Sequence, residues 1–172
     1  LSACDVSAVS CVYKCLIHAL AVVTWVGLLY YFNFVQVPAM ADALADEGGP
    51  GPAAIGKYIA PKALLWFRMS AAVTWLTGAW ALSLGYGFTN AFLLKPGAEM
   101  IGLGSWLGTI MLFNVWVLIW PNQKKILGMV EASAEEIAKA KFTAAMASRT
   151  NVVLSVPMLL CMIGAGHGGY LF

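Results

Sequence analysis

Charged residues are scarce in this sequence. Only 10% of its 172 residues are Asp, Glu, Lys or Arg, whereas 61% are hydrophobic. Soluble domains usually carry about 25% charged residues. The composition therefore excludes an ordinary soluble domain and predicts an integral membrane protein, with membrane lipids around it. The formal net charge of +2 gives no indication of nucleic-acid binding.

Paired cysteine motifs are absent from these 172 residues. The four cysteines are Cys4, Cys11, Cys15 and Cys161, and none of them belongs to a CxxCH or CxxC motif. CxxCH is the attachment motif of c-type haem, and paired CxxC motifs bind zinc. The sequence therefore excludes covalently attached haem and a cysteine-based zinc site within this stretch of chain.

What the sequence does contain is long apolar stretches. A helix needs about 20 mainly apolar residues to cross the roughly 30 Å hydrocarbon core of a bilayer. Four stretches meet this requirement, at residues 12–37, 63–86, 100–120 and 150–166. We therefore expect an all-α fold, an integral membrane four-helix up-down bundle that forms a single transmembrane domain over residues 1–172. The connections 38–62 and 121–149 would be its two long loops.

Several residues predict where these helices begin and end. Pro38 and the run EGGPGP at residues 47–52 indicate the end of the first span, Lys95-Pro96-Gly97 indicates a tight connection, and Pro121 indicates the end of the third span. Ser133-Ala-Glu-Glu136 is a capping-box pattern, which predicts a helix start. We expect a long amphipathic extension of the fourth helix from this point.

Three features inside the spans bear on packing. Pro157 predicts a kink in the fourth span, because proline frees a backbone carbonyl one turn earlier. The pair Gly104 and Gly108 is a GxxxG motif, which favours close approach of two helices. Asn114 should form a hydrogen bond to a neighbouring helix, since an unpaired amide in hydrocarbon costs several kcal/mol.

The basic residues predict the orientation. With four spans, eight of the ten Lys and Arg residues fall on the side of the two long loops, and only Lys14 and Lys95 fall on the other side. Cytoplasmic loops carry the excess of basic residues. We therefore expect both termini on the periplasmic side of a bacterial inner membrane.

The two histidines are the candidate ligands of a cofactor. His18 lies six residues after Val12, or about 9 Å along the first span at 1.5 Å per residue. His167 follows the fourth span on the same side, and helices one and four would be neighbours in the expected bundle. Two imidazoles that face each other would bind the iron of one b-type haem from both sides, which suits electron transfer.

Three more residues belong to this expected haem pocket. Trp25 lies two helical turns from His18 on the same face, and Gly27 and Gly164 would let a flat macrocycle approach the backbone. Two alternatives stay open. Each histidine could serve only as a structural hydrogen-bonding group, and a single histidine would suffice for a Mg-porphyrin pigment.

Several segments resemble a known family. The stretch GTIMLFNVWVLIWPNQKK at residues 108–125 is similar to the signature of the urate oxidase N-terminal family, the membrane domain of bacterial urate hydroxylases. Its Pro-Asn-Gln-Lys turn is the most specific part. Further similar segments are HALAVVTWVG at residues 18–27, WFR at 66–68, TWLTG at 74–78 and SRTNVVLSVPM at 148–158.

The resemblance implies further properties. In that family a longer membrane domain precedes a cytochrome c domain, which implies electron delivery on the periplasmic side. His18 matches a family position, and His167 matches by approximate spacing from Pro157. Arg149 and Thr150 stand where a family histidine is expected. A looser resemblance links the chain to the small four-helix haem proteins that oxidise protoporphyrinogen.

These observations lead to one principal functional prediction. We expect a membrane b-type haem protein with His18 and His167 as ligands, which transfers electrons as a subunit of a larger redox or energy-converting complex. Its partners would be other membrane subunits and a periplasmic cytochrome c. The alternatives are a cofactor-free structural subunit and a membrane oxidase that acts on urate or a porphyrin.

Overall fold

The computed structural model describes residues 3–167, and all regular secondary structure in this range is helical. The all-α prediction is therefore confirmed. In chain order the elements are α1 (Ala3–Tyr31), the π-helix η1 (Phe32–Gln36), α2 (Val37–Ala45), the π-helix η2 (Ile55–Ile59), α3 (Ala60–Leu84), α4 (Phe88–Phe92), α5 (Glu99–Phe113), the π-helix η3 (Asn114–Ile119), α6 (Trp120–Ile126) and α7 (Ala134–Gly166).

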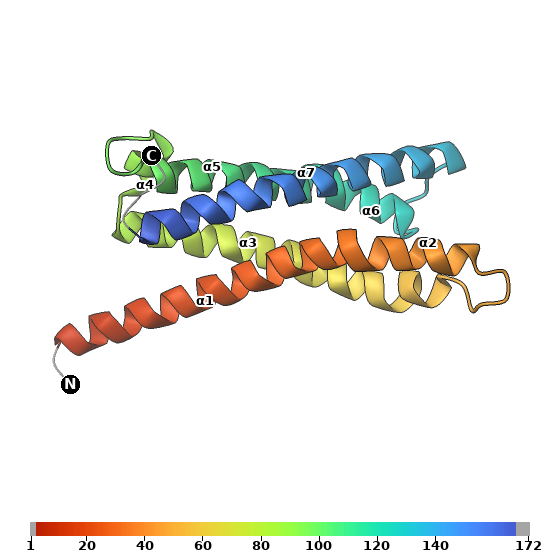
Figure 1. Cartoon of the computed structure of the whole chain (residues 1–172), viewed down its shortest axis with the longest axis horizontal. Helices are drawn as coiled ribbons and strands as arrows, with labels where there is room; N and C mark the ends of the chain where they lie inside the picture. Colours follow the sequence, from red (N-terminus) through yellow and green to blue (C-terminus); the bar gives the residue numbers. More distant parts are fainter. Residues whose placement is uncertain (1–2, 168–172) are drawn as a thin grey trace.

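The long helices form rods that lie along the long axis of the molecule (Figure 1). The rods are α1 with α2, then α3, then α5 with α6, and finally α7. The packing is chiefly pairwise, because α1 contacts mainly α3 and α5 contacts mainly α7. The first half of α1 diverges from the other rods (Figure 1). The expected close pairing of the first and last helices is therefore limited to the second half of α1.

Three helical stretches are long and apolar enough to cross a membrane, namely Val12–Ala45, Glu99–Ile126 and Ala134–Gly166. They include the expected spans 12–37, 100–120 and 150–166. Helix α3, which holds the expected span 63–86, is not among the three. Its tryptophans, threonines and Arg68 lower the hydropathy of this stretch.

Two helices continue through the prolines that were expected to end them. Pro38 is the second residue of α2 and Pro121 the second residue of α6, each directly after a π-helix. Pro61 stands in the same position after η2. Proline lacks an N–H group and its ring clashes with the carbonyl four residues earlier. The wider π turn relieves this clash, so the helix continues where the sequence rule predicts a stop.

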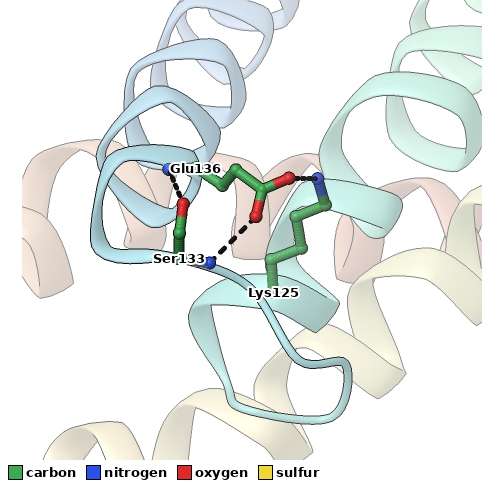
Figure 2. Close-up of polar contacts among 3 residues, drawn as sticks. All are labelled: Lys125, Ser133 and Glu136. Atoms are coloured by element: carbon green, nitrogen blue, oxygen red, sulfur yellow. Dashed lines mark hydrogen bonds and ion pairs between the residues drawn. The ribbon is translucent and has the colours of Figure 1, made fainter.

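Helix α7 begins at the predicted capping box. The Ser133 side chain accepts a hydrogen bond from the backbone N–H of Glu136, and the Glu136 carboxylate accepts one from the backbone N–H of Ser133 (Figure 2). Lys125 Nζ at the end of α6 lies 3.7 Å from Glu136 Oε1. From this cap α7 runs unbroken past Pro157 to Gly166, as one long helix.

The core lies where the four rods meet. Its largest buried apolar side chains are Trp25, Leu29, Phe67, Met111 and Val115. A polar pair crosses this core, because Asn114 Nδ2 donates to Asn151 Oδ1 at 2.8 Å and Asn151 Nδ2 donates to the carbonyl of Met111 at 3.0 Å. The predicted interhelical bond of Asn114 is thus confirmed.

The glycine motif of α5 also packs as predicted at its first position. A Cβ atom on Gly104 would lie 3.1 Å from Cys161 Cβ on α7, so the small residue sets the spacing of these two helices. Nothing lies within 4 Å of such an atom on Gly108. Gly108 instead borders an open space between the rods.

Candidate cofactor cavity

This space is an apolar cavity of about 540 Å³ between α1, α3, α5 and α7. It lies toward the end of the molecule where α1 starts and α7 ends, which we call the histidine end. Its walls are mostly aliphatic and aromatic side chains, and Gly78, Gly85 and Gly108 give flat stretches of wall. Ligand sites of proteins are typically cavities of 300–1,000 Å³ with such apolar linings and a few polar groups.

His18 is the only imidazole of the cavity wall among the described residues. Its Nδ1 lies 2.8 Å from Thr77 Oγ1 on α3. A Cβ atom on Gly78 would lie 3.2 Å from His18 Cε1, so the ring rests against the backbone of α3. The ring is half-buried and held at two adjacent positions of α3, which fixes its orientation.

The bonds of Thr77 determine which ring nitrogen of His18 carries the proton. The Thr77 hydroxyl donates to the carbonyl of Val73 at 2.7 Å, so its oxygen acts as an acceptor toward the ring. On this basis we assign the proton of a neutral His18 to Nδ1, because a neutral imidazole has one donor and one acceptor nitrogen. The lone pair is left on Nε2, and a second-shell bond of this kind is what orients histidines that bind metals.

Two further polar groups of the cavity wall have no hydrogen-bond partner among the described residues. Trp25 Nε1 and Thr74 Oγ1 are both buried and both unpaired, although their residues are only 1% and 7% exposed. Buried donors are nearly always satisfied in folded proteins. Both residues line the cavity, while the two unpaired atoms are themselves buried within its wall.

His167 does not border this cavity. It is the C-terminal cap of α7, it is exposed, and its Nδ1 lies 2.9 Å from the carbonyl of Ile163 in the same helix. The expected arrangement of two histidines across one macrocycle is therefore absent from this structure. The physical reason is that α1 diverges from α7 at the histidine end and packs His18 against α3 instead.

Of the other residues expected in the haem pocket, one lines the cavity and two do not. Trp25 lines the cavity. Gly27 is exposed with nothing within 4 Å of its Cβ position, so it lies outside the wall. Gly164 also lies outside the wall, where its carbonyl accepts the backbone N–H of His167.

Sequence reasoning missed several cavity residues. Thr74 and Gly78 of the TWLTG segment line the cavity, and Thr77 of the same segment contacts the His18 ring. Met158 and Met162, one helical turn apart on α7, form part of the opposite wall. Such methionines resemble ordinary core residues in a sequence, and only their position beside the cavity distinguishes them.

Arg68 lies near the other end of the molecule. Its guanidinium carbon is 3.6 Å from the centre of the Trp120 ring, and Lys124 Nζ is 5.9 Å from the same centre. The arginine therefore stacks on an aromatic ring of the neighbouring rod, a contact that favours Arg over Lys. It is far along α3 from His18 and takes no part in the cavity.

Among the side chains that the structure describes, those of residues 12–167, no group of three His, Cys, Asp or Glu is placed to hold a metal ion. A metal bound by several carboxylates or thiolates is therefore not built into the described part of the chain. A macrocycle that supplies four of the ligands itself needs only one or two protein groups.

Comparison with known proteins gives one match. No curated protein and no solved structure matches the chain. One family model does, and it covers residues 88–172. This range includes the Pro-Asn-Gln-Lys turn, the segment at residues 148–158 and His167, whereas His18, Trp25 and Thr77 lie before it. The model is that of the urate oxidase N-terminal family, so the resemblance expected from the sequence is confirmed over residues 88–172.

Proposed function

We propose that this protein is a membrane haem protein that transfers electrons, with a b-type haem in the cavity and His18 Nε2 as an axial ligand. One observation carries the proposal. A single imidazole, fixed by Thr77 with its Nε2 lone pair free, stands in the wall of a 540 Å³ apolar cavity. Imidazole nitrogen is a common axial ligand of haem iron.

The residues of the cavity fit a haem in two other respects. The apolar walls and flat glycine surfaces suit the faces of a macrocycle. Trp25 Nε1 and Thr74 Oγ1 are buried in the wall without partners, and a rotation of either side chain would let it donate to an acceptor oxygen at the rim of the haem, such as a carboxyl group. A Mg-porphyrin pigment would use the same features, and the metal content of the purified protein distinguishes it from haem.

In this proposal the protein spans the inner membrane of a bacterium as a four-helix up-down bundle. Three stretches are long and apolar enough to cross, and α3 would cross among them, shielded by its contacts with α1. The excess of basic residues on the side of the long loops supports an orientation in which the histidine end would face the periplasm. Helix α7 has 33 residues, about 50 Å, so its first part extends beyond a core of about 30 Å.

A bound haem supplies one-electron chemistry, in which the iron gains or loses a single electron without a change in the protein's covalent bonds. The residues of the chain would set its environment. Thr77 holds the ligand in place, Trp25 and Thr74 fix the rim, and the apolar walls exclude water. The electron would come from a membrane reductant and pass to a periplasmic acceptor, for which a cytochrome c is the expected class.

The exposed sides of the rods support a role as a subunit of a larger complex. Large apolar side chains are exposed along α1 and α7, including Leu20, Val23, Val153 and Val156. Lipid tails or the helices of other membrane subunits would cover them. A cofactor-free structural subunit would use the same faces, but it gives no account of the unpaired donors in the cavity.

A second candidate function is a membrane oxidase, favoured by the match to the urate oxidase N-terminal family. An oxidase needs an open coordination position for oxygen or substrate, whereas pure electron transfer does not. Binding of carbon monoxide to the reduced protein tests this difference. A large spectral shift at stoichiometric carbon monoxide would favour the oxidase.

The absorption spectrum of the purified full chain tests the proposal. We expect a Soret band and resolved bands after reduction, with about one haem per chain, and loss of haem in His18→Ala. His167→Ala serves as the matched control and should retain haem, since His167 lies outside the cavity. A folded but colourless wild-type protein would refute the proposal.

A further inference from the structure

We infer that Arg68 on α3 and Lys124 on α6 bind the phosphate of an anionic phospholipid, near the end of the molecule opposite the histidine end. The inference rests on the proposed membrane location and not on the haem, because neither residue lines the cavity. It assigns a ligand of stated charge to the half of the bundle for which the proposed function names none.

The two cations come from different rods and lie at the same aromatic ring. The guanidinium carbon of Arg68 is 3.6 Å from the centre of the Trp120 ring, and Lys124 Nζ is 5.9 Å from that centre. All three side chains are half-buried. Two positive charges so close together repel each other, and an anion bound between them would offset this repulsion.

No carboxylate among the described residues pairs with either cation. The ion pair found in this part of the chain joins Lys125 Nζ to Glu136 Oε1 at 3.7 Å, so it uses the neighbouring lysine of α6 (Figure 2). Arg68 lies eight residues after Ala60, about 12 Å along α3 and inside the expected span 63–86. A charge within a membrane span either pairs with another group or reaches the headgroups. Arg68 therefore needs an anion from outside the described chain.

The stacking of Arg68 is compatible with phosphate binding. A guanidinium is flat, so its contact with Trp120 uses one face, whereas its five N–H groups point outward in the plane. Two of these groups match two oxygens of one phosphate. The Lys124 ammonium offers three more donors for another oxygen. A planar fork from α3 and a point charge from α6 thus form a set of donors that fits a phosphate.

The level of the site favours a lipid over a free phosphate. Trp120 is the last residue of the expected span 100–120, and tryptophan side chains favour the level of the headgroups. Exposed apolar side chains continue from there toward the histidine end along α3 and along α5 with η3, namely Met69, Val73, Phe113 and Trp116. Acyl chains would lie against them. In the proposed orientation this end faces the cytoplasmic leaflet, which carries anionic lipids.

Native mass spectrometry of the detergent-purified full chain tests the inference. Dioleoyl phosphatidylglycerol and dioleoyl phosphatidylcholine are titrated in turn, with and without millimolar inorganic phosphate. Each basic residue near a membrane surface strengthens binding of anionic lipid about fivefold, so we expect one phosphatidylglycerol to bind about 20-fold more tightly than phosphatidylcholine. Inorganic phosphate should not displace it.

Variants test whether the two cations are responsible. Arg68→Gln and Lys124→Gln should each weaken phosphatidylglycerol binding about fivefold. Lys125→Gln is the matched control, because it removes the same charge from the same turn of α6, but from a side chain that is paired with Glu136. Its affinity should stay within about twofold of wild type.

Three results would overturn the inference. They are equal affinity of the wild type for the two lipids, an equal loss of affinity in Lys125→Gln, and displacement of the lipid by inorganic phosphate, which would indicate a site for a soluble phosphate. The first needs no variant, so it decides the question even if Arg68→Gln does not fold. Release of the chain from bilayers by alkaline carbonate would refute the proposed membrane location, which is a different result.

Discussion

His18 Nδ1 on α1 lies 2.8 Å from Thr77 Oγ1 on α3, and this bond fixes the orientation of the His18 ring. The hydroxyl is itself committed to the carbonyl of Val73, so the ring has one tautomer and one free lone pair. The bond joins helices whose residues are 59 positions apart in the chain. The bond therefore cannot be predicted from the sequence of α1 alone.

Removal of the Thr77 hydroxyl should weaken haem binding without abolishing it. In Thr77→Val the ring of His18 loses its fixed tautomer and orientation, and loss of such an outer-shell partner usually costs 10- to 100-fold in metal affinity. Haem titration of the apo-protein measures this change. Thr24→Val is the matched control, since Thr24 bonds only the carbonyl of Leu20 in its own helix and lies outside the cavity. Equal affinity of the two variants would argue against His18 as a ligand.

The two unpaired donors should affect stability and binding in different ways. In the haem-free protein, Trp25→Phe and Thr74→Val remove buried polar groups without partners, so the free energy of unfolding should stay within about 1 kcal/mol of wild type or rise. Haem affinity should fall about tenfold, because each variant loses a hydrogen bond of about 1.5 kcal/mol to the ligand. Thermal unfolding and haem titration measure the two quantities. Unchanged affinity in both variants would mean that the donors do not contact the ligand.

Alanine substitution should lower haem affinity at Gly78 but not at Gly27. Gly78→Ala places a Cβ atom 3.2 Å from His18 Cε1 and should displace the ring, with at least a tenfold loss of haem affinity. Gly27→Ala meets nothing within 4 Å and should leave affinity unchanged, while helix propensity adds up to about 1 kcal/mol of stability. Haem titration of the two proteins side by side checks this. A stronger effect at Gly27 would place the cofactor on the wrong side of α1.

Substitutions at Asn114 and Asn151 should have strongly non-additive effects on the free energy of unfolding. Asn151→Leu leaves Asn114 Nδ2 without its acceptor in a buried site, which should cost about 1–3 kcal/mol. The double variant with Asn114→Leu should recover part of this loss, because no amide then remains unpaired. Unfolding in mixed detergents gives the double-mutant cycle. Simple additivity of the two substitutions would contradict the observed bond.

The cap of α7 should make stability depend on acidity. The backbone N–H of Ser133, with Lys125 nearby, lowers the pKa of Glu136 below its ordinary value of 4.5. This carboxyl lies in the exposed first turn, outside the apolar part of α7. Because its folded pKa is the lower one, its contribution is present above the unfolded pKa and is lost as the pH falls through the folded pKa.

Unfolding temperatures between about pH 6 and about pH 3 test this dependence. Wild type should lose more stability than Glu136→Gln over this window, since glutamine cannot be protonated there. Glu135→Gln is the control, because Glu135 is the neighbouring acid of the same turn and has no part in the cap. Identical pH profiles for wild type and Glu136→Gln would contradict the role of the carboxylate.

Local features of the fold could be predicted from the sequence, whereas relations between rods could not. The Ser133 cap depends on four adjacent residues, and Asn114 needed only some partner across the core. Pro38 and Pro121 were assigned as helix ends because the rule treats an α turn as the only choice. The chain widens to a π turn instead. His167 was paired with His18 by sequence position, and the divergence of α1 depends on side chains of three other rods.

The π-helices before Pro38, Pro61 and Pro121 also change the angular phase of the chain. A π turn contains an additional residue, so each one rotates the following helix by roughly 100° about its axis relative to an uninterrupted α-helix. An apolar stripe drawn on one helical wheel through residues 99–126 would thus be out of phase beyond residue 119. The stacking of Trp120 on Arg68 depends on that rotation, and deletion of one residue from η3 would turn the indole away from the guanidinium.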